Sequence, residues 1–147
     1  MAVTLLVTGG TRSGKSNFAE ERARDFGQQL GKRLIYIATA EAFDEEMAAR
    51  IARHQRRRGP EWHTVHAPLD LVQAVTQTDG KGPCVIDCLT LWLSNLMLAG
   101  QDTEVAADAL VASLASRTNP VILVTNEVGS GIVPENALAR RFRDEAG

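Results

Sequence analysis

Short apolar runs rich in β-branched residues alternate along the chain with longer segments of helical periodicity. The runs predict buried strands at residues 3–8, 33–40, 62–65, 83–87 and 120–127. Helices are predicted between and after them, at residues 17–26, 44–58, 69–75, 89–98, 103–116 and 134–146. Strands that alternate with helices form parallel βαβ units. The pattern therefore predicts one α/β domain over residues 1–147, with a mostly parallel sheet and helices on both faces.

A phosphate-binding motif lies between the first predicted strand and the first predicted helix. The pattern G-x-x-x-x-G-K-[ST] is matched in this stretch by Gly9, Gly10, Thr11, Arg12, Ser13, Gly14, Lys15 and Ser16. Its glycines let backbone N–H groups point at an anion, and the helix N-terminus adds partial positive charge. Lys15 is expected to reach the β- and γ-phosphates, and the Ser16 hydroxyl to bind Mg²⁺. The alternative is a plain Gly-rich turn, but the strand and helix around it favour a P-loop NTPase of the RecA-like type that binds a nucleoside triphosphate.

An acidic residue at the end of a neighbouring strand is needed to hold magnesium in such a site. Asp87 fits this role, because it ends an apolar strand and a helix begins directly after it. The alternative role for Asp87 is that of a helix N-cap, for which Asp is also favoured. Glu127 ends another predicted strand and is the second candidate.

The helix at residues 44–58 carries a histidine and a basic end. With a period of 3.6, Met47, Ile51, His54 and Arg58 fall on one face, so His54 is expected to point toward the sheet or a cleft. Nearby arginines disfavour a second positive charge and so favour the neutral imidazole, the form that acts as nucleophile or base. A histidine on an apolar stripe is more often a core residue, and an arginine run is more often a solvated helix end. With a triphosphate nearby, the arginines become candidates for phosphate contact.

Composition narrows the remaining possibilities. The chain has 16 basic and 18 acidic residues, a net charge of −2, which gives no indication of a nucleic-acid partner or an anionic membrane surface. The apolar segment 89–99 is too short to cross a bilayer, and no signal peptide is recognised, so a cytoplasmic protein is expected. Cys84 and Cys88 have no partners at zinc-ligand spacing and are expected to be buried, reduced thiols. The helix at 89–98 is apolar nearly all round, which predicts either a subunit interface or a deep position within the chain.

Six blocks of sequence resemble the bifunctional adenosylcobinamide kinase and adenosylcobinamide-phosphate guanylyltransferase family of cobalamin assembly. They read V-T-G-G-x-R-S-G-K-S, Y-I-A-T, E-M-A-A-R-I-x-x-H, R-x-x-x-W-x-T-x, D-C-L-T-L-W-L-S-N-L and V-T-N-E-V-G-x-G-I-V-P-E-N-x-L-A-R-x-F-R-D, at residues 7–16, 36–39, 46–54, 58–65, 87–96 and 124–144. The last block is long and is not shared with NTPases in general. The resemblance covers almost the whole chain in the family's order.

The resemblance implies two reactions and assigns residues to them. The family phosphorylates adenosylcobinamide with ATP or GTP, then takes GMP from GTP onto a histidine and passes it to adenosylcobinamide phosphate. That histidine corresponds to His54, and Asp87 matches a position that carries Asp or Glu. The residues expected to contact the guanine nucleotide match Ala38, Thr39, Ala40, Gln55, Arg56, Arg57 and Arg58. The resemblance also suggests a homo-oligomer, a trimer.

The chain departs from the family's pattern at two places. His66 stands where family members commonly carry an acid, and it is a candidate nucleotide contact. The sequence stops at Gly147, whereas the family continues through another helix and a final strand, so the C-terminal part of the family's chain is expected to be absent. Two other functions stay open: a simple P-loop kinase in which His54 is structural, and a binding protein switched by GTP.

Overall fold

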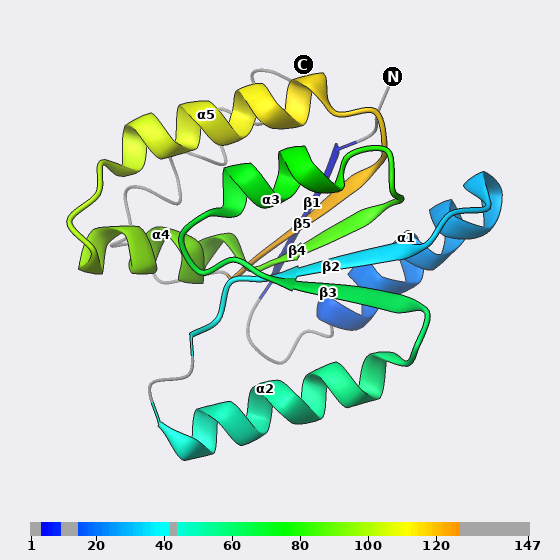
Figure 1. The fold of residues 1–147 in the computed structure, drawn as a ribbon, viewed down its shortest axis with the longest axis horizontal. Coiled ribbons are helices and arrows are strands. Elements are labelled where there is room, and N and C mark those ends of the chain that lie inside the picture. Colours follow the sequence, from blue (N-terminus) through cyan, green and yellow to red (C-terminus); the bar gives the residue numbers. More distant parts are fainter. Residues whose placement is uncertain (1–3, 10–14, 42–43, 127–147) are drawn as a thin grey trace.

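A computed structural model describes residues 4–9, 15–41 and 44–126 of the chain (Figure 1). Strands and helices alternate in it along most of the sequence. They are β1 (Thr4–Gly9), α1 (Lys15–Leu30), β2 (Leu34–Ala38), α2 (Glu45–Arg58), β3 (Trp62–His66), α3 (Leu71–Thr78), β4 (Cys84–Asp87), α4 (Leu89–Leu98), α5 (Thr103–Ser116) and β5 (Val121–Asn126). The strands form one five-stranded sheet in the order β1-β5-β4-β2-β3, and every pairing is parallel. The predicted α/β fold is confirmed; the helix predicted at 134–146 lies outside the described residues.

Apolar side chains cover both faces of this sheet. On one face α1 contributes Ala19 and Ala23, which pack with Tyr36 of β2 and with neighbouring strands. On the other face α3, α4 and α5 enclose the larger cluster, with Trp92 as its largest fully buried side chain. Helices thus lie on both faces, as predicted (Figure 1). Cys84 and Cys88 belong to opposite clusters, are both buried and form no disulfide, as expected.

Helix α1 is longer than the sequence indicated. The helix predicted to end at residue 26 continues through Gly27 to Leu30 and ends before Gly31, which has a φ of 63°. A Cβ atom at Gly27 would lie 2.7 Å from the Leu34 side chain. Gly27 therefore permits close packing of α1 against the start of β2. A glycine that ends a helix and a glycine that allows close packing look the same in the sequence, so the sequence alone does not show which role Gly27 has.

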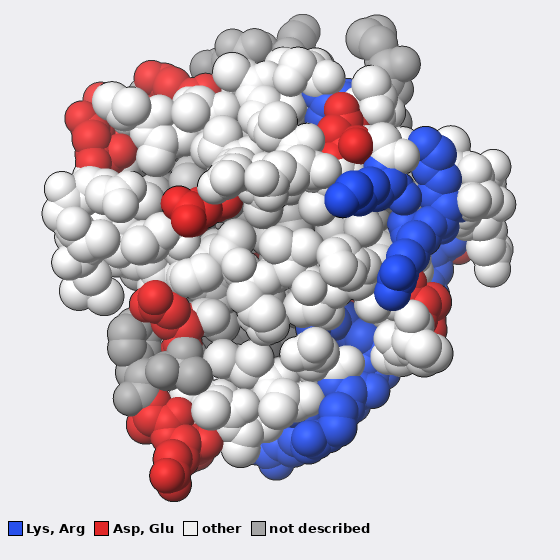
Figure 2. Space-filling model, viewed as in Figure 1, with Lys and Arg blue, Asp and Glu red and all other residues white. Residues whose placement is uncertain are grey.

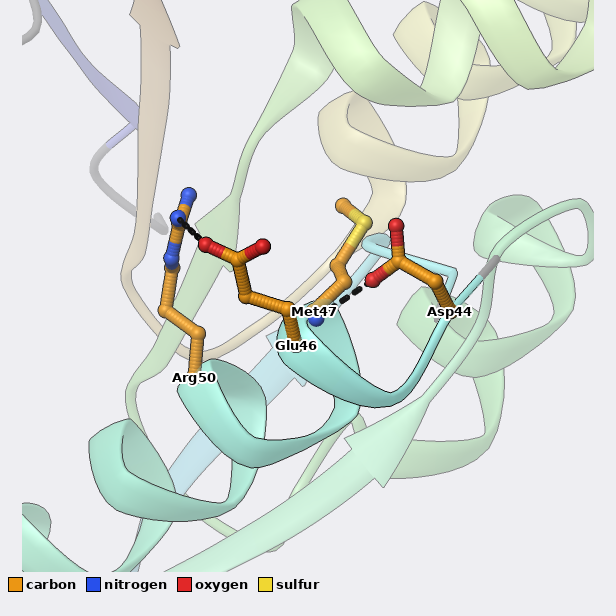
Figure 3. A network of polar contacts seen from close by, with 4 residues as sticks. All are labelled: Asp44, Glu46, Met47 and Arg50. Atoms are coloured by element: carbon orange, nitrogen blue, oxygen red, sulfur yellow. Dashed lines mark hydrogen bonds and ion pairs between the residues drawn. The ribbon is translucent and has the colours of Figure 1, made fainter.

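Helix α2 stands apart from the rest of the fold, below β3 and α1 in Figure 1. Asp44 caps it by accepting a hydrogen bond from the Met47 N–H at 2.7 Å, and Glu46 pairs with Arg50 one turn later at 3.7 Å (Figure 3). Acidic residues occupy its first turn and arginines its last, in the sense that the helix dipole favours. Figure 2 shows the two charges at opposite ends of the helix. Of the residues in α2, Arg58 is the buried one.

Helix α4 is covered largely from within the chain. Six of its ten residues are buried, namely Leu89, Thr90, Trp92, Leu93, Asn95 and Leu96. Met97 and Leu98, at its C-terminal end, are 57% and 80% exposed. Of the two explanations for its apolar sequence, the intramolecular position accounts for most of the helix. No helix in the described ranges is long and apolar enough to span a bilayer.

Candidate functional site

One row of residues crosses the sheet near the carboxyl ends of all its strands. Asp87 of β4 is in register with Val124 of β5 on one side and with Ala38 of β2 on the other. Val124 in turn pairs with Val7 of β1, and Ala38 with His66 of β3. Side chains in register point to the same face of a parallel sheet. The row therefore places the predicted site residues Ala38, His66 and Asp87 together, on the face that α1 covers.

The strand of Asp87 is not adjacent to β1, contrary to the sequence-based expectation, because β5 lies between them. Two strand spacings separate β4 from β1, about 10 Å. The true neighbour of β1 is β5, and Glu127, the second candidate acid, follows it but lies outside the described residues.

The phosphate-binding motif connects β1 to α1. Gly9 ends the strand, and Lys15 and Ser16 begin the helix, so the strand and helix required on either side of the motif are confirmed. Gly10, Thr11, Arg12, Ser13 and Gly14 lie outside the described residues.

The Asp87 carboxylate is half-buried and is held by Tyr36, whose hydroxyl donates to its Oδ2. Burial raises the pKa of Tyr36 well above its usual range, and the charge and hydrogen bond of Asp87 raise it further, against the opposing charge of Arg58. The phenol therefore stays neutral and remains a donor. Sequence reasoning missed Tyr36; the signal that could have found it is that a buried tyrosine needs a partner for its hydroxyl.

Arg58 lies over the face of Tyr36. Its guanidinium carbon is 3.6 Å from the ring centroid, and its Nη2 lies 3.4 Å from the Thr64 hydroxyl, to which it donates. The Trp62 ring meets the Tyr36 ring edge-on, with centroids 5.8 Å apart. Arg58 is only 6% exposed. Its side chain is thus packed against Tyr36 and Thr64, while Gln55, Arg56 and Arg57 of the same helix are exposed.

Glu20 of α1 is a further acidic group of the site that sequence reasoning did not single out. Burial raises its pKa; the charges of Arg24, Arg58 and His54 act against this rise, and that of Asp87 adds to it. The half-buried Glu20 thus feels charges from α2 and from β4 at once. An acid five positions after Lys15 carries no special sequence signal, and only the fold brings it to the site.

His54 is exposed, so the expectation that it packs against the sheet is wrong, and a position toward a cleft stays a prediction. Met47 and Ile51, on the same stripe, are only partly buried. Helical periodicity correctly placed these residues on one face with Arg58, but the helix touches the body of the fold at its C-terminal end, and its face does not pack along the sheet. The imidazole remains close enough for its charge to act on Glu20.

Thr39, a predicted nucleotide contact, has a fully buried side chain. Its hydroxyl accepts a hydrogen bond from the Cys88 N–H and donates one to the Cys88 carbonyl. Asn95 donates to the Thr39 carbonyl at 2.8 Å and to the Pro68 carbonyl at 3.0 Å. The Thr39 side chain thus fixes the turn after Asp87. Ala40, the next residue, is partly accessible.

The chemistry of the donors is suited to magnesium. In the part of the chain that the structure describes, no group of three or more His, Cys, Asp or Glu side chains could hold a metal ion. Mg²⁺ does not need such a cage, since it is usually bound through one or two carboxylates together with substrate phosphates and water. Asp87, a hard oxygen donor at the sheet edge facing the phosphate-binding motif, fits that pattern.

Comparisons with known proteins identify the family of the chain. The profile of the family described as cobinamide kinase / cobinamide phosphate guanyltransferase matches residues 5–147. The bifunctional adenosylcobalamin biosynthesis protein CobP of Pseudomonas aeruginosa is 44% identical over an alignment of 145 residues that covers 97% of this chain and 82% of that protein. The CobU proteins of Salmonella typhimurium and Escherichia coli, with the same description, are each 40% identical over 159 residues, covering 97% of this chain and 85% of theirs. The chain therefore belongs to the cobinamide kinase / cobinamide phosphate guanyltransferase family of adenosylcobalamin biosynthesis enzymes.

Proposed function

We propose that this enzyme phosphorylates adenosylcobinamide with ATP or GTP and then transfers GMP from GTP, through a guanylylated His54, to give adenosylcobinamide-GDP. The observation that carries the proposal is the position of Asp87, in one row with β1 and on the face that α1 covers. The phosphate-binding motif and a carboxylate thus face the same edge of the sheet. Ala38, Ala40 and His66 lie at that edge too, as the proposed surroundings of the nucleotide, whereas the Thr39 hydroxyl holds the Cys88 backbone.

The first proposed reaction is phosphoryl transfer. The hydroxyl oxygen of the aminopropanol arm bonds to the γ-phosphorus, the bond from that phosphorus to the β–γ bridging oxygen breaks, and the hydroxyl proton is released. Such transfers depend mainly on positioning and on charge stabilisation. In this chain backbone N–H groups of the motif and Lys15 would supply both.

The second proposed reaction is a two-step nucleotidyl transfer. An imidazole nitrogen of neutral His54 bonds to the α-phosphorus of GTP, and the α–β bond breaks to release pyrophosphate. A phosphate oxygen of adenosylcobinamide phosphate then bonds to the same phosphorus, and the P–N bond breaks to restore the histidine. The exposure of His54 leaves its ring accessible to both substrates.

Ser16 and Asp87 are the residues that would hold Mg²⁺, and the cation would offset the negative charge of the nucleotide phosphates. Lys15 would add its charge at the leaving phosphates. Arg56 and Arg57, exposed in the last turn of α2, are further candidates for contact with the nucleotide, together with Gln55.

Labelling with GTP that carries radioactive phosphorus at the α-position tests the covalent step. We expect an acid-labile, alkali-stable protein adduct that is lost in His54→Ala. His63→Ala is the matched control, because His63 is also exposed but lies in register with Ile35, on the opposite face of the sheet. It should keep the adduct. An adduct that persists in His54→Ala would contradict the role of this histidine.

Transfer from γ-labelled ATP to adenosylcobinamide separates the remaining functions. A simple kinase would phosphorylate the corrinoid and form no protein adduct with GTP. A GTP-switched binding protein would do neither. The proposed enzyme does both, and His54→Ala should retain phosphoryl transfer.

We also propose that copies of the chain associate. Large apolar side chains are exposed at the end of α4 and in the first turn of α5, namely Met97, Leu98 and Val105. The trimer implied by the family resemblance would cover such side chains. Sedimentation equilibrium of the purified protein gives the number of chains, and a monomer at micromolar concentration would refute the association.

A further inference from the structure

A chain of contacts leads from α2 to the acid at the end of β4. Arg58, the last residue of α2, stacks at 3.6 Å on the ring of Tyr36, and the Tyr36 hydroxyl donates to Asp87 Oδ2. Arg58 and Tyr36 are 6% and 5% exposed. Both are therefore fixed by packing, whereas the carboxylate they reach is only half-buried.

Each contact restricts one degree of freedom in the next side chain. A planar guanidinium over an aromatic face fixes that face by cation–π attraction, and a lysine cannot reproduce this stacking. The edge of Trp62 meets the Tyr36 ring at an interplanar angle of 85°, which closes another side of the ring. The hydroxyl of a ring held in this way fixes the rotation of the Asp87 carboxylate about its Cβ–Cγ bond.

Arg58 is also the residue through which α2 is buried, and α2 carries His54 one turn earlier. We propose that Tyr36 is a positioning residue that aims the Asp87 carboxylate at the metal, and that Arg58 holds Tyr36 in place, so that metal binding depends on how α2 is seated. This inference rests on the proposed role of Asp87 in holding Mg²⁺. It assigns a function to two buried residues, neither of which is proposed to bind the metal.

Metal affinity measured directly tests the first half of the proposal. Mn²⁺, added with a GTP analogue whose β–γ bridge is an imido group, is followed by the electron paramagnetic resonance signal of the free ion. In Tyr36→Phe, which loses only the hydroxyl, we expect the Mn²⁺ dissociation constant to rise about tenfold, the size typical for partners of a metal-binding side chain. The affinity for the analogue without metal should be unchanged.

Ser113→Ala is the matched control, because it too removes one hydroxyl that donates a hydrogen bond, here to the Leu110 carbonyl at 2.8 Å, on α5 at the opposite face of the sheet. It should leave the Mn²⁺ affinity within about twofold of the parent protein. Unfolding midpoints of both variants show whether either is damaged as a whole. If Tyr36→Phe binds Mn²⁺ as tightly as the parent protein, or if Ser113→Ala loses the same affinity, the positioning role is refuted.

A double-variant cycle tests the second half. Arg58→Met should weaken Mn²⁺ binding in the same direction as Tyr36→Phe, and Arg58→Lys should not restore it. Because Arg58 acts through the tyrosine, the double variant should bind no more weakly than Tyr36→Phe alone. Multiplied losses in the double variant would show that Arg58 acts by another route.

These outcomes are separable from failure of the proposed function. Loss of the proposed function would appear in the parent protein, as absence of phosphoryl transfer to adenosylcobinamide and of the GTP adduct. Failure of the positioning role would leave both reactions intact in the parent protein, with Mn²⁺ affinity unmoved in Tyr36→Phe.

Discussion

The Thr39 hydroxyl bridges both backbone polar groups of Cys88, accepting from its N–H at 2.9 Å and donating to its carbonyl at 2.7 Å. Cys88 is the N-cap of α4 and directly follows Asp87. One buried side chain at the end of β2 thus fixes the turn that carries the acid from β4 into α4. A residue expected to touch the nucleotide is, in this structure, committed to holding the site's backbone.

Thr39→Val should destabilise the protein and lower both activities. Valine keeps the shape but leaves a buried N–H and a buried carbonyl without their partner, at a cost of about 2 kcal/mol or more. Thr39→Ser is the control, because it retains the hydroxyl. Urea unfolding of the two variants should place Thr39→Ser close to the parent protein and Thr39→Val clearly below it. Equal unfolding midpoints for both would contradict this account.

The second prediction concerns two glycines in the turn before β4. Gly82 has a φ of 155°, and a Cβ atom there would lie 1.7 Å from the Arg33 carbonyl oxygen. Gly80 has a φ of 87°, with nothing within 4 Å of such an atom. Gly80→Ala should therefore cost only the backbone strain of about 1 to 2 kcal/mol, whereas Gly82→Ala must displace the start of β2.

Thermal unfolding of the two alanine variants gives the order directly. Gly82→Ala should unfold at a much lower temperature than Gly80→Ala or should fail to accumulate as folded protein. Comparable melting temperatures for the two would mean that β2 yields easily at Arg33, against the close approach seen here.

The sequence predicted the elements of this fold well because local signals decide them. Strands rich in β-branched residues, the Asp44 cap and the arginines closing α2 all have a physical effect within one turn of chain. The order of the strands is not decided by local signals, and no residue near Asp87 indicates that β5 lies between β4 and β1. The sequence therefore identified Asp87 as the candidate acid but did not predict how far its strand lies from the phosphate-binding motif.

The remaining differences at the site also arise from long-range packing. Periodicity gives the face of a helix but not whether that face meets the sheet, so His54 was placed inward although only Arg58 is buried. Tyr36 and Glu20 gained their significance from partners on other elements, which a linear pattern cannot supply.

The last prediction concerns pH and a carboxylate far from the site. Asp79 Oδ1 accepts hydrogen bonds from the Thr118 N–H at 2.9 Å, the Thr118 hydroxyl at 2.8 Å and the Asn119 N–H at 3.3 Å. Burial alone would raise the pKa of Asp79, but these hydrogen bonds and the charge of Arg117 outweigh it and lower the pKa. A carboxyl whose pKa is lower in the folded state stabilises that state above its unfolded pKa, about 3.9. This stabilisation is lost as the pH falls from there through the folded value.

Asp79→Asn should consequently lower the free energy of unfolding at pH 7 by about 1 to 2 kcal/mol, since the amide accepts these hydrogen bonds less strongly than the carboxylate. The difference from the parent protein should shrink as the pH is lowered below about 4, because the parent carboxyl then also becomes neutral. Asp70→Asn is the control, since the Asp70 side chain is exposed and makes no capping hydrogen bond to α3. Urea unfolding between about pH 3 and pH 7, a range in which carboxyl groups titrate, gives the free energy of unfolding of both variants. A difference for Asp79→Asn that stays constant across this range would show that the hydrogen bonds do not depend on the charge.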